Sequence, residues 1–263
     1  AAAPPRPWET PECVALNRLR PRATLFPFPG ARGALTRDPR RSPWVKSLNG
    51  SWRFRLVGSP DAAPRSFASP RHSDATWDTV DVPGNWTMQG YDKPWYTNII
   101  MPFDNEPPTV PDVNPTGLYR TTFSLPREWK RKRIVLHFGG VESAFYCFVN
   151  GTQVGFGKGS RTPVEFDISA QVTTGRNVLA VKVVRFSDGS YLEDQDHWWM
   201  AGIYRDVYLY ATEQVFLEDV FVHGGLDASQ QSGELEVNAD IGSTTGHPAG
   251  CSVEVELYSS TGK

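Results

Sequence analysis

Cysteine and histidine are scarce in this sequence, and their scarcity excludes several kinds of chemistry. The 263 residues include only 3 cysteines and 5 histidines. Because Cys13, Cys147 and Cys251 are far apart and form no C-x-x-C pair, we expect no disulfide framework and a reducing, cytoplasmic compartment. No two histidines have metal-ligand spacing, and the sequence contains no G-x-S-x-G, H-E-x-x-H or P-loop motif.

Net charge and long apolar runs are also lacking. The 27 lysines and arginines nearly balance 29 aspartates and glutamates, and the net charge of −2 lacks the basic footprint of a nucleic-acid or membrane-surface protein. The one dense basic run, residues 127–133 (REWKRKR), is interpreted as a solvated turn beside a strand. No window approaches about 18 apolar residues, the length that a membrane-spanning helix needs. We therefore expect neither nucleic acid nor a membrane among the partners.

Short alternating segments are abundant from residue 48 onward. Residues 52–56 (WRFRL) alternate as a half-buried strand does, and Asn150-Gly151 carries the sequence signal of a tight hairpin between 144–149 and 152–156. The same pattern predicts strands at 117–125, 133–138, 178–186 and 204–210. No stretch keeps a helical period, so the sequence predicts an all-β fold, a sandwich or a barrel. Cys147, inside an apolar strand, is expected to be a small core residue.

Composition divides the chain into three parts. Residues 1–47 are rich in Pro, Arg and Ala and predict an extended arm, with a short helical turn at 11–19. Residues 48–212 form the first β-domain. Residues 213–263 offer three expected strands, at 215–222, 233–239 and 252–258. Because a sandwich needs about seven strands, we expect this chain to be a fragment cut inside its second domain.

An acidic and aromatic stretch at 187–207 is the first candidate site. Asp194 and Asp196 are two residues apart and share a face in extended conformation, so one of them could pair with an arginine such as Arg205 while the other faces a cleft. A solvated acidic loop is the alternative. The neighbouring Trp198 and Trp199, which could be core or wall, favour a carbohydrate or cation surface, because aromatic faces and carboxylates both suit sugars.

The long segment 83–115 has seven prolines and no periodicity, and we interpret it as a functional surface loop. Asn98 within it could bond a sugar hydroxyl through its amide or could cap a turn. Asn105-Glu106 could suggest a glycosidase acid, because retaining enzymes need two carboxyls about 5 Å apart. The pair precedes Pro107-Pro108 inside a loop, so we reject it and assign no catalytic residue in this chain.

At these residues the chain resembles the N-terminal region of the bacterial-type β-galactosidases of glycoside hydrolase family 2. The resemblance covers about residues 8–258. The segments that carry it are WETPECVALNRLRPRA, SLNGSWRF, VDVPGNWTMQGYDKPWYTNIIMPF, PPTVPDVNPTGLYRTTF, GVESAFYCFVNGTQVGFGKGSRTPVEFDIS and RFSDGSYLEDQDHWWMAGIYRDVYL.

The resemblance implies a jelly-roll β-sandwich, the sugar-binding domain, followed by the start of an immunoglobulin-like β-sandwich. The activity implied is retaining hydrolysis of terminal β-D-galactosides such as lactose. The catalytic glutamates, and the Mg²⁺ of the family, belong to a later barrel domain outside this chain, so this fragment alone is predicted to be inactive. The alternatives are a stand-alone carbohydrate-binding or assembly module without catalysis, and β-glucuronides or β-mannosides as the substrate class.

Three residues inherit roles from the resemblance. Asn98 matches a substrate-contacting asparagine, and Ile99 matches a position that lines the outer sugar-binding mouth. Asp196 matches an aspartate that binds galactose hydroxyls and a sodium ion. Trp199 departs from the family, which usually carries arginine there, and this puts the local ion pairing in doubt.

The arm implies further partners. In the family the N-terminal segment packs at a subunit interface, so a homo-oligomer is expected, with Trp8, Leu16 and Leu19 as apolar contacts. The other partners expected are a β-galactoside sugar and the remaining domains of the same chain.

Overall fold

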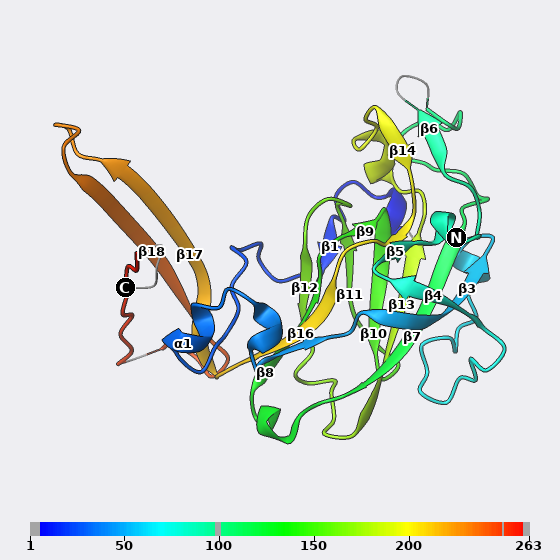
Figure 1. Ribbon diagram of the computed structural model, residues 1–263. Helices are drawn as coiled ribbons and strands as arrows, with labels where there is room; N and C mark the ends of the chain where they lie inside the picture. Colours follow the sequence, from blue (N-terminus) through cyan, green and yellow to red (C-terminus); the bar gives the residue numbers. More distant parts are fainter. Residues whose placement is uncertain (1–5, 98–100, 249, 260–263) are drawn as a thin grey trace.

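The computed structural model describes residues 6–97, 101–248 and 250–259. Its main body is a sandwich of two antiparallel sheets (Figure 1). The larger sheet has the order β1-β11-β10-β13-β7-β3-β4, with bounds Ala15–Leu16, Thr152–Lys158, Ala144–Val149, Arg176–Val184, Thr116–Ser124, Gly50–Val57 and Asp78–Val82. The smaller sheet has the order β12-β8-β16-β2, with bounds Val164–Asp167, Arg133–Phe138, Val207–Thr212 and Val45–Ser47.

Several short strands and helical turns lie outside these two sheets. Three short strands form a small sheet of order β5-β15-β9, namely Gly84–Asn85, Gly202–Ile203 and Val141–Glu142. The strands β6 (Trp95–Thr97) and β14 (His197–Trp199) form a separate ribbon. Helical structure in the described residues is limited to α1 (Ala31–Ala34) and the 3-10 turns η1 to η6, at Pro7–Glu9, Pro39–Arg41, Pro60–Ala62, Trp86–Met88, Arg127–Trp129 and Asp188–Tyr191. The predicted all-β, jelly-roll class is confirmed.

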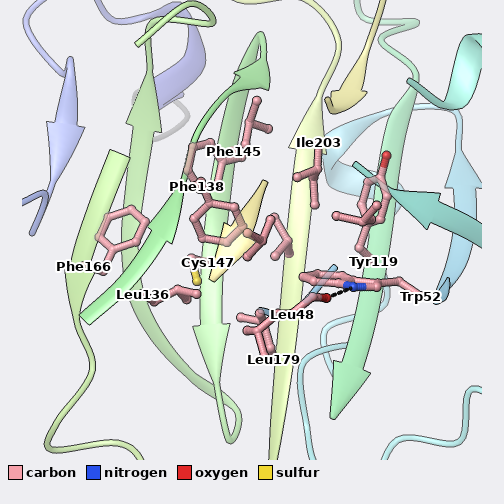
Figure 2. Packing of buried hydrophobic residues seen from close by; sticks show 14 of the residues in the cluster. Leu48, Trp52, Tyr119, Leu136, Phe138, Phe145, Cys147, Phe166, Leu179 and Ile203 are labelled. Atoms are coloured by element: carbon pink, nitrogen blue, oxygen red, sulfur yellow. Dashed lines mark hydrogen bonds between the residues drawn. The ribbon is translucent and has the colours of Figure 1, made fainter. Parts of the chain in front are cut away.

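The core fills the space between the two sheets. In β3 the side chains of Trp52 and Phe54 point inward while Arg53 and Arg55 point outward, as the two-residue period of a strand requires. Figure 2 shows Trp52 among buried residues from both sheets; the labelled members are Leu48, Trp52, Tyr119, Leu136, Phe138, Phe145, Cys147, Phe166, Leu179 and Ile203. Burial of Cys147 confirms its predicted core role and raises the pKa of its thiol.

The β10–β11 hairpin forms at the predicted Asn150-Gly151 turn. Both residues have positive φ, 52° and 88°, which is the backbone that a two-residue hairpin loop needs. The Asn150 amide also donates to Gln171 O at 2.8 Å, and its Oδ1 accepts from Val178 N at 2.9 Å. The turn therefore fixes the hairpin and ties it to the neighbouring loop.

The arm departs from the prediction. No helical turn forms over 11–19; the turn is η1, and residues 15–16 instead form β1 against the edge strand β11, with Leu16 opposite Phe156. A free sheet edge offers unpaired backbone groups, and pairing with it satisfies the arm's own backbone. Trp8 is buried against Tyr146 of this chain, while Leu16 remains 41% exposed.

The C-terminal part is a long hairpin that projects from the sandwich (Figure 1). Strands β17 (Val215–Leu226) and β18 (Gly233–Ser243) contain the strands predicted at 215–222 and 233–239. The strand predicted at 252–258 is wrong: this segment is irregular and exposed, since it has no ladder partner in the described part of the chain. The boundary at 212/213 and the immunoglobulin-like nature of the second part stay predictions.

One glycine tests the packing between the arm and the two sheets. A Cβ at Gly155 of β11 would lie 2.1 Å from Phe166 Cε1 and 2.8 Å from Leu16 O. We expect Gly155→Ala to lower the free energy of unfolding by about 1–3 kcal/mol, because overpacking forces core side chains and backbone to shift. Urea unfolding at 25 °C measures this. Gly175→Ala is the matched control, since nothing lies within 4 Å of its Cβ position; equal stability of the two variants would contradict the packing described.

Candidate functional site

The ribbon of β6 and β14 presents the candidate site at one end of the sandwich (Figure 1). Trp95 lies opposite Trp199, and Tyr96 lies opposite Trp198. Because side chains alternate along a strand, the two pairs occupy opposite faces. Trp199 is buried at 5% exposure, whereas Tyr96 and Trp198 are 53% and 56% exposed. Trp199 is thus a core residue, whereas Trp198 lies on the surface.

The inner face of the ribbon is anchored by Arg185. Its side chain is 1% exposed, forms an ion pair with Asp92 and donates to the carbonyl of Lys93 at 2.7 Å. The guanidinium also lies over the rings of Trp95 and Phe186, at 5.0 and 5.1 Å from their centroids. Arg185 follows directly after β13, so it joins the large sheet to the turn that leads into β6.

Asp196, the candidate ligand-binding carboxylate, lies in the bend that immediately precedes β14. Asp196 is exposed, and its Oδ1 accepts a hydrogen bond from the Tyr96 hydroxyl at 2.5 Å. This hydrogen bond raises the pKa of Tyr96, because ionisation would place two negative charges side by side. The Tyr96 ring packs against Trp198, with centroids 5.6 Å apart. An oriented carboxylate therefore lies beside two exposed aromatic rings.

Two other acids of the stretch, Glu193 and Asp188, hold the loop in place. Glu193 accepts from the backbone N–H and the hydroxyl of Ser160, at 2.7 and 2.5 Å. Asp188 binds Lys158, with 2.8 Å from Nζ to each carboxylate oxygen, and both side chains are buried. The same ammonium donates to the arm carbonyls of Pro7 and Thr10, at 3.2 and 3.0 Å. Lys158 therefore ties the arm to the acidic loop.

Beneath the ribbon lies a second ion pair. Arg161 binds Glu142 at 3.2 Å, and its guanidinium lies 2.8 Å from Nε2 of His197. Burial raises the pKa of Glu142, although Arg161 opposes the shift. Met200 N donates to the other Glu142 oxygen at 3.3 Å. Glu142 and Arg161 thus support both ends of β14 from inside the protein.

The structure does not describe every residue that the sequence predicted for the site. Asn98 and Ile99 lie outside the described residues. Arg205 bonds the carbonyls of Gly139 and Arg161, and no ion pair joins it to Asp194 or Asp196 in the described region; the expected pairing is wrong. Sequence reasoning missed Tyr96, because its contact with Asp196 depends on the pairing of β6 with β14, which no local pattern predicts.

The donor chemistry of Asp196 suits one ligand of a monovalent cation. Among the residues that the structure describes, no three His, Cys, Asp or Glu side chains gather as a metal cluster. Asp196 offers one carboxylate oxygen beyond the one that Tyr96 occupies, and carboxylate oxygen is a hard ligand of the kind that hard cations prefer. A sodium ion at this carboxylate would need further oxygens from elsewhere.

None of the described helices has the length and apolar character needed to cross a membrane.

Comparison with known proteins assigns a class to this sandwich. Residues 45–213 match the family described as "Glycosyl hydrolases family 2, sugar binding domain". The sandwich is therefore a sugar-binding domain of the glycosyl hydrolase type. The chain belongs to glycosyl hydrolase family 2, as the sequence motifs predicted.

The relatives are much longer proteins. A β-galactosidase of Priestia megaterium is 45% identical over 236 residues, which are 88% of this chain and 23% of that protein. A β-galactosidase of Vibrio vulnificus (strain CMCP6) is 44% identical over 258 residues, 97% of this chain and 24% of that protein. The chain thus spans about a quarter of the length of the curated relatives that it matches, and it matches their sugar-binding domain.

Solved structures show the same fold. A β-glycosidase from Bacteroides vulgatus aligns with a TM-score of 0.59 and 23% identity, covering 76% of this chain and 24% of that one. A β-glucuronidase from Ruminococcus gnavus aligns with a TM-score of 0.56 and 17% identity, covering 75% of this chain and 33% of that one.

Arg185 provides a test of how the ribbon is held. We expect Arg185→Lys to lower the free energy of unfolding by about 2 kcal/mol, because an ammonium cannot bind Asp92, reach the Lys93 carbonyl and stack on Trp95 together. Urea unfolding measures the stability. The rate of limited proteolysis near residues 92–97 should rise. The exposed Arg176→Lys is the matched control; unchanged stability and proteolysis in Arg185→Lys would refute the anchoring role.

Proposed function

We propose that this chain is the N-terminal part of a retaining β-galactosidase that hydrolyses terminal β-D-galactosides such as lactose. Its similarity to β-galactosidases at 44–45% identity over most of its length supports the proposal. The single structural observation that carries it is the exposed Asp196 carboxylate, oriented by Tyr96 and flanked by Trp198. The catalytic glutamates are proposed to lie in a barrel domain elsewhere in the full polypeptide, so this chain supplies substrate contacts.

Each contact has a distinct chemical role in this proposal. The Asp196 carboxylate accepts hydrogen bonds from galactose hydroxyls, which are stronger than neutral ones because the acceptor is charged. Asn98 adds an amide that can both donate and accept, and Ile99 lines the outer mouth. Such residues do no proton transfer. They raise the rate of hydrolysis by holding the sugar in the reactive orientation, because that rate depends strongly on orientation.

Sodium belongs to the same proposal. When bound, a sodium ion would supply electrostatic attraction to a sugar hydroxyl, with Asp196 as one of its ligands. Asp196 would offer the ion one oxygen, because the Tyr96 hydroxyl engages the other. The family's Mg²⁺ is proposed to belong to the catalytic barrel, and this chain offers it no proposed ligand.

Assembly and location complete the proposal. The arm is proposed to support a homo-oligomer, with exposed Leu16 as an available apolar contact, and the three cysteines fit a cytoplasmic protein. The alternative is a stand-alone carbohydrate-binding or assembly module, favoured by the sandwich enclosing its own core between its two sheets. The intact mass of the native polypeptide separates the two: several hundred further residues support the β-galactosidase, and a chain of about this length supports the module.

Asp196 is the residue to change first in the full-length polypeptide. We expect Asp196→Asn to lower kcat/KM for a β-galactoside about 100-fold and to weaken its response to sodium, since hydrogen bonds to a charged group contribute about 1.5–3 kcal/mol each. Steady-state kinetics at varied sodium check this. Glu234→Gln, an exposed acid on β18, is the control. Kinetics of Asp196→Asn equal to those of the parent would sink the proposed role.

A further inference from the structure

We propose that Tyr96 is a positioning residue, whose hydroxyl fixes the orientation of the Asp196 carboxylate before the sugar arrives. This inference rests on the proposed function of Asp196. Tyr96 acts through another residue, because its only assigned polar contact in the described region is Asp196 Oδ1, at 2.5 Å.

The register of the ribbon places Tyr96 where it can do this. Tyr96 lies directly opposite Trp198, and Asp196 lies in the bend that immediately precedes β14. The Tyr96 hydroxyl therefore reaches from β6 to the carboxylate at the entry of the neighbouring strand, 100 positions away in the sequence.

The Tyr96 ring is itself held. It packs on Trp198 at 5.6 Å, with an interplanar angle of 53°. The ribbon beneath is fixed by Trp95 and Trp199, whose rings lie 5.4 and 6.4 Å from Phe186. A ring with two rotatable bonds, restrained by a neighbour and by a buried anchor, loses little entropy when its hydroxyl bonds a partner. The Tyr96 hydroxyl is thus a donor whose ring is restrained on one side by Trp198.

Asp196 needs such a donor. Its side chain is exposed, and no arginine, lysine or backbone N–H bonds it in the described part of the chain. An unrestrained carboxylate would have to lose its rotational freedom on binding, and that loss opposes affinity. The Tyr96 bond restrains the group beforehand. It also occupies one oxygen and leaves the other to face the ligand.

The test removes the hydroxyl alone. Tyr96→Phe in the full-length polypeptide keeps the ring on Trp198. We expect the Kd for galactose, measured by calorimetry, to rise about tenfold, and kcat/KM for a β-galactoside to fall about tenfold, a change of about 1.4 kcal/mol. The melting temperature should stay within about 1 °C of the parent, because surface changes alter stability little.

Two comparisons make the test specific. Tyr258→Phe is the matched control, because Tyr258 also donates to an exposed carboxylate, that of Glu256, on the C-terminal segment outside the ribbon; its binding and kinetics should match the parent. A double-mutant cycle then asks whether Tyr96 acts through Asp196. In an Asp196→Asn background, Tyr96→Phe should add less than about a twofold further loss of galactose affinity.

The outcomes separate the two proposals. If Asp196→Asn loses affinity and activity while Tyr96→Phe keeps both, the positioning role is wrong and the proposed function stands. If Tyr96→Phe costs the same factor in both backgrounds, Tyr96 acts independently of Asp196 and the inference is overturned. If Asp196→Asn behaves as the parent does, the role of Asp196 fails and the positioning role fails with it.

Discussion

The buried guanidinium of Arg185 is the contact on which the geometry of the candidate site depends. It follows β13, one of the central strands of the large sheet, and binds Asp92 and the Lys93 carbonyl just before β6. Without it, the segment entering β6 would be joined to the sandwich mainly by aromatic packing. An ion pair with such low exposure is costly to desolvate and adds little net stability. Its value lies in geometry, because one planar guanidinium binds Asp92 and the Lys93 carbonyl while it lies over two aromatic rings.

Lys158 joins the arm to the acidic loop, as Arg185 joins the ribbon to the large sheet. A single ammonium neutralises the buried Asp188 and also donates hydrogen bonds to two backbone carbonyls of the arm. Three separate parts of the chain therefore meet at one charge. Since a buried cation must be fully paired, loss of any one of these partners would leave the others poorly satisfied. The order of the arm and the order of the acidic loop are accordingly coupled.

Local pattern predicted most of the sandwich and little of the site. The strands at 133–138 and 144–149 and the Asn150-Gly151 turn were readable because alternation and turn chemistry are local signals. The segment 252–258 alternates equally well yet forms no strand, since a ladder requires a partner that pattern alone cannot supply. Asp196 stood out by charge and by resemblance. Tyr96 did not, because its role depends on the pairing of β6 with β14, which is set by contacts between distant segments such as Arg185 with Asp92.

The turn at Asn150 has a consequence for the chemical ageing of the protein. Asn-Gly is the dipeptide most prone to deamidation, in which the glycine nitrogen attacks the side-chain amide carbon and releases ammonia. Here the Asn150 side chain is held by three bonds, to Gln171 O, Asn177 Oδ1 and Val178 N. The amide carbon cannot turn toward the Gly151 nitrogen without breaking them. The same hydrogen bonds that hold the turn therefore slow deamidation of Asn150 for as long as the sandwich stays folded.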